Sequence, residues 1–179
     1  MTPHLAGTPQ LETERLVLRG PEGPDWEGWA RLALSERAQH IGGPYSRETA
    51  FRAWGHVIGH WAMRGFGSFV ITRKDTGQAI GHCGPWFPEG WPEHELGWTI
   101  WSREDEGQGY AFEAASAARD HAFHTLGWRT AVSYIDDGNL RSIALARRLG
   151  ATQDETAPKP DHDAPPILVF RHAHAASRP

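Results

Sequence analysis

Residues 106 to 113 read Glu-Gly-Gln-Gly-Tyr-Ala-Phe-Glu, so that two glycines lead directly into an alanine-rich segment. The apolar run Leu-Gly-Trp-Thr-Ile-Trp at 96 to 101 precedes them and is typical of a strand. A strand, a glycine turn and a helix N-terminus leave backbone N–H groups unpaired and directed at one point, where the helix dipole adds about half a positive charge. The segment therefore predicts an anion site suited to phosphate.

The spacing of these glycines argues against two phosphate-binding motifs. No third glycine and no Lys-Ser/Thr pair follows Gly109, so neither the dinucleotide fingerprint nor the P-loop fits. On the loop alone, a tight turn that merely begins a helix stays open as an alternative.

Four segments, the glycine segment among them, occur in a characteristic order. They are Glu-Leu-Gly-Trp at 95–98, Gly-Gln-Gly-Tyr-Ala-Phe-Glu-Ala at 107–114, Ala-Phe-His-Thr-Leu-Gly at 122–127 and Asn-Leu-Arg-Ser-Ile-Ala-Leu-Ala-Arg-Arg-Leu-Gly at 139–150. With the opening strand at 11–19 and Gly-Gly-Pro at 42–44, the chain resembles the GNAT superfamily of acyl-CoA-dependent N-acyltransferases. Within it, the chain resembles the Rim-type branch, which acetylates ribosomal-protein N-termini.

The resemblance covers nearly the whole chain and implies its fold. We expect an α/β GNAT fold, with a central mixed, mostly antiparallel sheet of about seven strands flanked by about four helices. Residues 1–179 would form a single N-acetyltransferase domain, with 1–9 and 173–179 as flexible tails. The predicted strands are 13–19, 67–73, 78–85, 93–102, 129–135, 151–156 and 166–172, and the predicted helices are 25–39, 47–63, 109–126 and 139–149.

The resemblance also implies where the acyl donor, acetyl-CoA, would lie. The cofactor-binding residues carried over from the family are Trp98, Ile100, Glu106, Gly107, Gln108, Gly109, Tyr110, Ala111, Asn139 and Ser142. The chain departs from the family pattern at Glu106, where Arg, Gln or Trp is common, and at Phe112 and Ala151. Glu106 would place a negative charge beside the pyrophosphate, which weakens binding unless the side chain turns away.

The implied reaction needs a base and an acid. An amine must be neutral to attack a thioester, yet at pH 7 deprotonating a lysine amine costs roughly 4.6 kcal/mol and an α-amine about 1.2 kcal/mol. Glu95, at the head of the predicted strand 93–102, is the candidate base, although an exposed strand-end carboxylate is the alternative. Ser142 matches the family position that protonates the departing thiolate, and Tyr134 is the alternative acid. A backbone N–H near Trp98 would meet the oxyanion.

The resemblance implies that the acceptor substrate enters between the first helix pair and the last hairpin. We assign Tyr45, Trp54, His82 and Trp86 to the walls of this entrance, together with the proline-rich loop 157–166. A structural role for the aromatic residues, as core or as cover for edge strands, is the alternative.

Composition excludes several other classes. A net charge of -4 argues against nucleic acid, and no run approaches the ~18 apolar residues of a membrane span. Cys83 is the single cysteine and no secretory signal opens the chain, so we expect a cytoplasmic protein. The histidine pairs 56/60 and 121/124 lack a third ligand, so no metal is expected.

The resemblance, together with these residues, implies transfer of an acetyl group from acetyl-CoA to a primary amine by direct attack in a ternary complex. The alternative is a non-catalytic acyl-CoA-binding or sensing module on the same fold. A hydrolase is disfavoured because the chain has no Gly-x-Ser-x-Gly elbow. The acceptor, a small molecule or a peptide, stays open among protein N-termini, antibiotics, polyamines and amino acids, and a homodimer is compatible with the resemblance.

Overall fold

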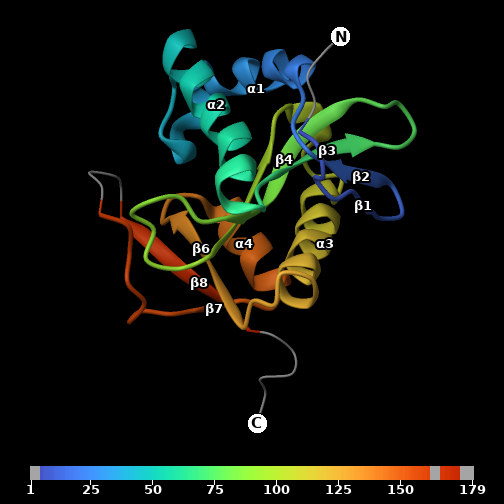
Figure 1. Cartoon of the computed structure of the whole chain (residues 1–179). Helices are drawn as coiled ribbons and strands as arrows, with labels where there is room; N and C mark the ends of the chain where they lie inside the picture. Colours follow the sequence, from blue (N-terminus) through green and yellow to red (C-terminus); the bar gives the residue numbers. More distant parts are fainter. Residues whose placement is uncertain (1–4, 162–165, 174–179) are drawn as a thin grey trace.

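The computed structural model describes residues 5–161 and 166–173 (Figure 1). In this part of the chain, one eight-stranded sheet has the order β1-β2-β3-β4-β5-β6-β8-β7. All neighbouring strands pair antiparallel except β5 and β6, which are parallel. The predicted mixed sheet is therefore confirmed. The strands are β1 (Leu11–Glu12), β2 (Leu16–Arg19), β3 (Phe69–Arg73), β4 (Ala79–Trp86), β5 (Glu95–Ile100), β6 (Thr130–Asp136), β7 (Thr152–Gln153) and β8 (Ile167–Ala173).

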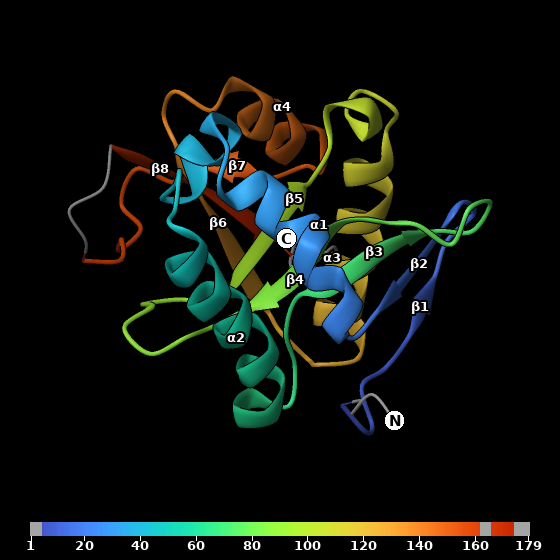
Figure 2. The same ribbon diagram turned by 90° about the horizontal axis from the view of Figure 1, so that it is seen from above.

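Helices cover both faces of this sheet (Figures 1 and 2). The α-helices of the described chain are α1 (Trp26–Ala33), α2 (Arg47–Arg64), α3 (Tyr110–His124) and α4 (Leu140–Arg148), with short 3₁₀ helices η1 (Gly23–Asp25), η2 (Glu36–Ile41) and η3 (Arg103–Asp105). Among the helices described, none combines the length and the apolar composition needed to cross a membrane.

Buried clusters fix the helices to the two faces of the sheet. On the α1/α2 face, Trp29 and Trp54 pack with Val70 of β3 and with Trp101, which follows β5 directly. On the other face, the alanines of α3 pack against the sheet: Ala114, Ala118 and Ala122 are fully buried. Small side chains let a helix approach a sheet closely, so the N-terminus of α3 is held near the end of β5.

Two predicted elements are shorter than the sequence indicated. The predicted helix 25–39 is interrupted after α1, because Ser35 is extended and its hydroxyl donates to the carbonyl of Leu32 at 2.7 Å. The predicted strand 151–156 keeps only the two residues of β7, because the Asp154 carboxylate accepts the Thr156 N–H at 3.1 Å and turns the chain.

The predicted tails are also corrected in part. Leu5 packs against the α3-side core, and Ala173 belongs to β8, where it pairs with Thr130. The remainder of the predicted tails, residues 1–4 and 174–179, lies outside the described residues.

The parallel strands β5 and β6 separate soon after they meet. Their register joins only Glu95 with Val132, whose N–H donates to the His94 carbonyl at 2.9 Å. One residue further on, the hydroxyl of Ser133 reaches the Leu96 carbonyl at 2.6 Å in place of a backbone bond. Beyond Leu96 the two strands diverge, and this gap positions the candidate site.

Candidate active site

A cleft of ≈ 540 Å³ opens where β5 and β6 separate. It is lined by β4, β5 and β6, by η2 and the following loop, by α2, and by the first turn of α4. The predicted catalytic residues Glu95, Tyr134 and Ser142 all line this cleft, together with Trp98 and Asn139. Residues far apart in the sequence therefore meet at the opening between the strands.

The glycine loop lies between the end of β5 and α3. Gly107 and Gly109 have φ of 74° and 83°, a left-handed conformation that glycine adopts without strain. Gly109 precedes the first helical residue, and no side chain caps the helix. In the described chain, no hydrogen bond to another residue uses the N–H groups of residues 107–112. Uncapped N–H groups at a helix N-terminus suit a phosphate, so the loop fits the diphosphate of CoA.

Glu106 contributes differently from the sequence expectation. Its backbone N–H donates to the Arg103 carbonyl at 3.2 Å, so this N–H is not available to a ligand. Its side chain accepts from Arg37 at 2.6 Å and also pairs with Arg141. Two guanidinium groups therefore offset the carboxylate, and they lower its pKa against the effect of burial. The expected repulsion of a pyrophosphate is removed by these arginines.

Trp98 contributes both its backbone and its side chain. Along a strand, the N–H and C=O groups of one residue point to the same side, and successive residues alternate between the two sides. The carbonyls of His94 and Leu96 point toward β6. The N–H and C=O groups of Trp98 therefore also point to the β6 side, at a position where β6 has diverged from β5 and does not pair with it. Its N–H is thus placed for an oxyanion or a pantetheine carbonyl. Ile100 does not line the cleft; its side chain packs on the α3-side core and its carbonyl is bound by Arg37.

The first turn of α4 brings Asn139 and Ser142 to the cleft. The Asn139 side-chain oxygen accepts from the Ser142 N–H at 3.2 Å, which caps the helix and leaves the amide nitrogen without a partner among the described residues. The Ser142 hydroxyl oxygen accepts from the Trp98 indole N–H at 3.3 Å. Because its oxygen is engaged as an acceptor, the Ser142 hydroxyl hydrogen is available to a group in the cleft.

Glu95 lies on the opposite side of the gap from Ser142. Side chains alternate along β5, so Glu95 shares the α2 face with Trp86, its cross-strand partner in β4. Its carboxylate accepts from the Trp91 indole N–H at 2.6 Å. Burial raises the pKa of Glu95 to about 7, and hydrogen bonds from Trp91 and the Tyr134 backbone oppose the rise. A carboxylate with this pKa is suited to accept a proton near neutral pH.

Tyr134 lies on β6 near Glu95. Its hydroxyl is buried and has no hydrogen-bond partner among the described residues. Burial raises the pKa of Tyr134 to about 12, and the charges of Glu93 and Glu95 contribute to the rise. The next residue, Ile135, packs against Ile143 of α4, so Tyr134 points away from α4 and Ser142.

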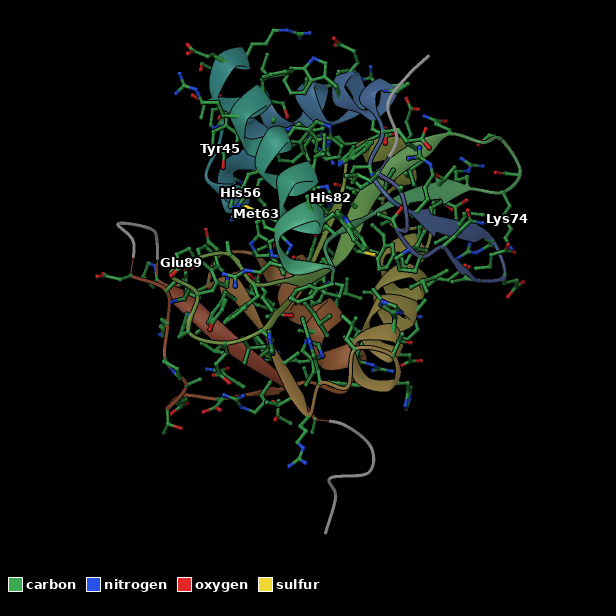
Figure 3. The ribbon with its side chains drawn as sticks, viewed as in Figure 1. Tyr45, His56, Met63, Lys74, His82 and Glu89 are labelled. Carbon is green, nitrogen blue, oxygen red and sulfur yellow. The ribbon has the colours of Figure 1, made fainter. Side chains whose placement is uncertain are left out.

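Three of the predicted acceptor residues line the cleft: Tyr45, His82 and Trp86. Tyr45 follows η2, and its hydroxyl donates to the Ile41 carbonyl. Figure 3 shows Tyr45 and His82 among the side chains around α2. In the predicted loop wall 157–166, residues 162–165 lie outside the described residues, and the neighbouring Ile167 lines the cleft.

Trp54 does not line the cleft, contrary to the sequence expectation. Its side chain is 2% exposed and packs between Trp29 and Trp101, with ring centroids 6.0 Å and 5.7 Å away. Its ring lies 6.1 Å from that of His82. Trp54 therefore supports the wall from behind, because the buried face of α2 turns it into the core.

His82 is held as a neutral donor on the wall. Its Nδ1 is 2.9 Å from the Trp101 indole nitrogen, which can only donate, so Nδ1 accepts. Burial lowers the pKa of His82 to about 4, so the ring is neutral at pH 7 and its proton lies on Nε2. His82 thus offers an N–H group and no charge to the cleft.

Other reactive side chains have structural partners. Both ring nitrogens of His60 are engaged, one with the Phe66 carbonyl at 2.8 Å and the other with the Phe87 N–H at 2.9 Å. Cys83 is fully buried, and burial raises the pKa of its thiol. Among the described residues, no group of three or more His, Cys, Asp or Glu side chains could hold a metal ion.

Sequence reasoning missed three contributors to this site. Trp91 binds the candidate base, and its position four residues before Glu95 in a tryptophan-rich loop was the only signal. Arg37 falls within the continuous helix predicted at 25–39, and that prediction gives no reason to expect its bonds to the carbonyls of Ile100 and Trp101. His40 pairs with Asp136 at 3.0 Å on the cleft wall, and nothing in the sequence connects these two residues.

Comparison with known proteins agrees with this geometry. Residues 15–152 match the family model described as an acetyltransferase (GNAT) domain. The uncharacterized protein YkkB of Bacillus subtilis (strain 168) is 33% identical over 171 residues, which cover 90% of this chain and 94% of that protein.

Solved structures show the same fold. The structure of an acetyltransferase from Agrobacterium tumefaciens str. C58 is 38% identical, with a TM-score of 0.87, and the match covers 96% of this chain and 98% of that one. RimL, a ribosomal L7/L12 α-N-protein acetyltransferase solved with coenzyme A, is similar at 19% identity, with a TM-score of 0.73 and coverage of 94% and 100%. The chain belongs to the GNAT acetyltransferase family, whose activity is acetyl transfer from acyl-CoA.

Proposed function

We propose that this protein is an acetyl-CoA-dependent N-acetyltransferase that acetylates a primary amine by direct attack in a ternary complex. The observation that carries the proposal is the placement of Glu95 and Ser142 on opposite sides of the gap between β5 and β6. A base on the acceptor side and a proton donor on the α4 side are what direct transfer requires.

The chain supplies binding groups along the whole donor. The N–H groups of residues 107–112 would hold the diphosphate, and the Asn139 amide nitrogen would bind a pantetheine amide. The Trp98 N–H, which faces the gap, would stabilise the developing oxyanion. Acetyl-CoA, when bound, supplies the activated thioester carbonyl.

Two side chains would move the protons. Glu95, whose pKa burial raises to about 7, takes a proton from the ammonium form of the acceptor, directly or through water, and so leaves a neutral amine to attack the thioester. Ser142 gives its hydroxyl proton to the departing sulfur while the Trp98 indole N–H stabilises its oxygen. We favour Ser142 over Tyr134 as the acid, because Tyr134 projects from the face of β6 away from α4.

The Rim-type branch is part of the proposal for the acceptor. The similarity to RimL, which acts on a protein α-amine, makes a protein or peptide N-terminus one candidate. An α-amine would require less help from Glu95 than a side-chain amine, because it is far easier to deprotonate. Small-molecule amines are the other candidates.

The decisive experiment is a panel of amines assayed with acetyl-CoA and detection of free thiol. The panel includes peptides with free α-amines, polyamines, aminoglycosides and amino acids. Amine-dependent release of CoA, with a stoichiometric acetylated amine found by mass spectrometry, supports the proposal. Binding of acetyl-CoA without turnover on any amine would instead favour the non-catalytic acyl-CoA-binding module.

A further inference from the structure

Arg37 of η2 binds three oxygen atoms around the start of the glycine loop. Its guanidinium donates to the Trp101 carbonyl at 2.6 Å, the Ile100 carbonyl at 3.2 Å and the Glu106 carboxylate at 2.6 Å. The side chain is 20% exposed, so these bonds form in a partly desolvated setting. The Arg37 guanidinium, which comes from η2 on the acceptor side of the cleft, thus binds both the end of β5 and Glu106, the first residue of the loop.

The Glu106 carboxylate carries a full negative charge, and the two carbonyl oxygens carry partial negative charges. All three belong to residues that come just before the N–H groups of residues 107–112 in the sequence. Without Arg37, the Glu106 carboxylate and two carbonyl dipoles would stand beside the place where a diphosphate binds. A negative charge close to an anion site opposes the binding of an anion, more so where water is partly excluded. The guanidinium of Arg37 therefore offsets the negative charge of Glu106 and of the two carbonyl dipoles beside the glycine loop.

Arg141 cannot take over this task. It shares the Glu106 carboxylate, but its side chain is 81% exposed. An exposed ion pair is weakened by solvent and salt, and a long exposed side chain loses entropy when it is fixed. Arg141 also has no bond to the Ile100 or Trp101 carbonyls, which Arg37 binds.

We propose that Arg37 is a positioning residue of the cofactor site, which keeps the start of the glycine loop fixed and electropositive for the diphosphate of the acyl donor. The inference rests on the proposed function and adds a residue outside the glycine loop and α4. It assigns to Arg37 a selectivity for donors with a diphosphate over donors without one.

The test compares two donors in the Arg37→Met variant, which keeps an unbranched side chain and loses the guanidinium. CoA binding is measured by calorimetry, and kcat/KM is measured with acetyl-CoA and with S-acetylpantetheine, which has no phosphate. We expect CoA affinity to fall roughly 10- to 50-fold, in line with the loss of a charge-assisted interaction. We expect kcat/KM for S-acetylpantetheine to change less than about threefold. Arg52→Met, which removes an exposed arginine from α2, is the matched control.

A double variant tests whether the loss of CoA affinity comes from the charge of Glu106 or from a disordered loop structure. The Arg37→Met/Glu106→Gln variant also lacks the carboxylate that Arg37 offsets, so part of the lost CoA affinity should return, whereas a purely structural defect would deepen. Equal losses with both donors, or an unchanged CoA affinity in Arg37→Met, would overturn the inference while leaving the proposed function intact. Failure of the wild-type protein to bind CoA would overturn the proposed function itself.

Discussion

Replacing Glu95 by Gln should stabilise the ligand-free protein at alkaline pH. Burial raises the pKa of Glu95 from 4.5 to about 7. Between these values the native state holds a proton that the unfolded state has released, so native stability falls as pH rises. A difference of about 2.5 pKa units corresponds to at most about 3.4 kcal/mol, most of which is lost between pH 4.5 and pH 8. Gln carries no charge and avoids this penalty, while its amide oxygen can still accept from Trp91.

The assay is urea unfolding of the wild type and Glu95→Gln at pH 5 and pH 8. The stability of the variant relative to the wild type should rise by about 2.5 kcal/mol from pH 5 to pH 8, because most of the loss in the wild type falls in this interval. Glu89→Gln, at a fully exposed side chain, is the control and should show little change with pH. A stability difference that is the same at both pH values would refute the buried-carboxylate reasoning.

The same variant should lose activity. With an amine of high pKa, the rate should fall by roughly 10² to 10⁴ near pH 7, and rising pH should restore much of it, because solvent then supplies the neutral amine. With an α-amine the defect should be smaller, following the roughly 3.4 kcal/mol difference in deprotonation cost. If Glu95→Gln left rate and pH profile unchanged for every accepted amine, Glu95 would not be the base, and a water chain or His94 would replace it as the candidate.

Three further variants test the remaining parts of the site. Trp91→Phe removes the N–H that lowers the pKa of Glu95, so the acidic limb of the kcat/KM profile should move to higher pH; a profile that stays in place would disprove the link. Ser142→Ala should reduce kcat more than acetyl-CoA affinity, and a larger defect in Tyr134→Phe would transfer the acid role to tyrosine. Gly109→Val should abolish most of the ~2.7 kcal/mol stabilisation by acetyl-CoA at 100 times its dissociation constant, because valine is strained at a φ of 83°. A full thermal shift in a folded variant would contradict it.

The glycine loop was predictable because its signal is local. Gly107 and Gly109 are required where the backbone turns left-handed, and a helix must follow directly to expose its N–H groups. Asn139 was predictable for the same reason, since a helix cap depends on residues three positions apart. Each of these features is decided within a single turn of chain.

Features decided by tertiary packing were not predictable. Trp54 is 2% exposed whereas Phe51, three residues earlier on α2, is 63% exposed, although both are large and apolar. The sequence of α2 carries tryptophan, glycine and histidine on several sides, so its pattern does not indicate which face meets the sheet. The pKa of Glu95 depends likewise on how the loop containing Trp91 returns over β5, a path that proline content alone does not determine.

Glu106 shows how a departure from a family pattern can be compensated at a distance. A carboxylate before the diphosphate loop is unfavourable by itself, and the sequence gives no neighbour within the loop to offset it. In the folded chain, Arg37 arrives from η2 and Arg141 from α4, so one carboxylate joins the acceptor wall, the loop and the helix that carries Ser142. A carboxylate that would weaken an isolated anion site can thus hold together the elements around that site, provided that more than one cation is paired with it.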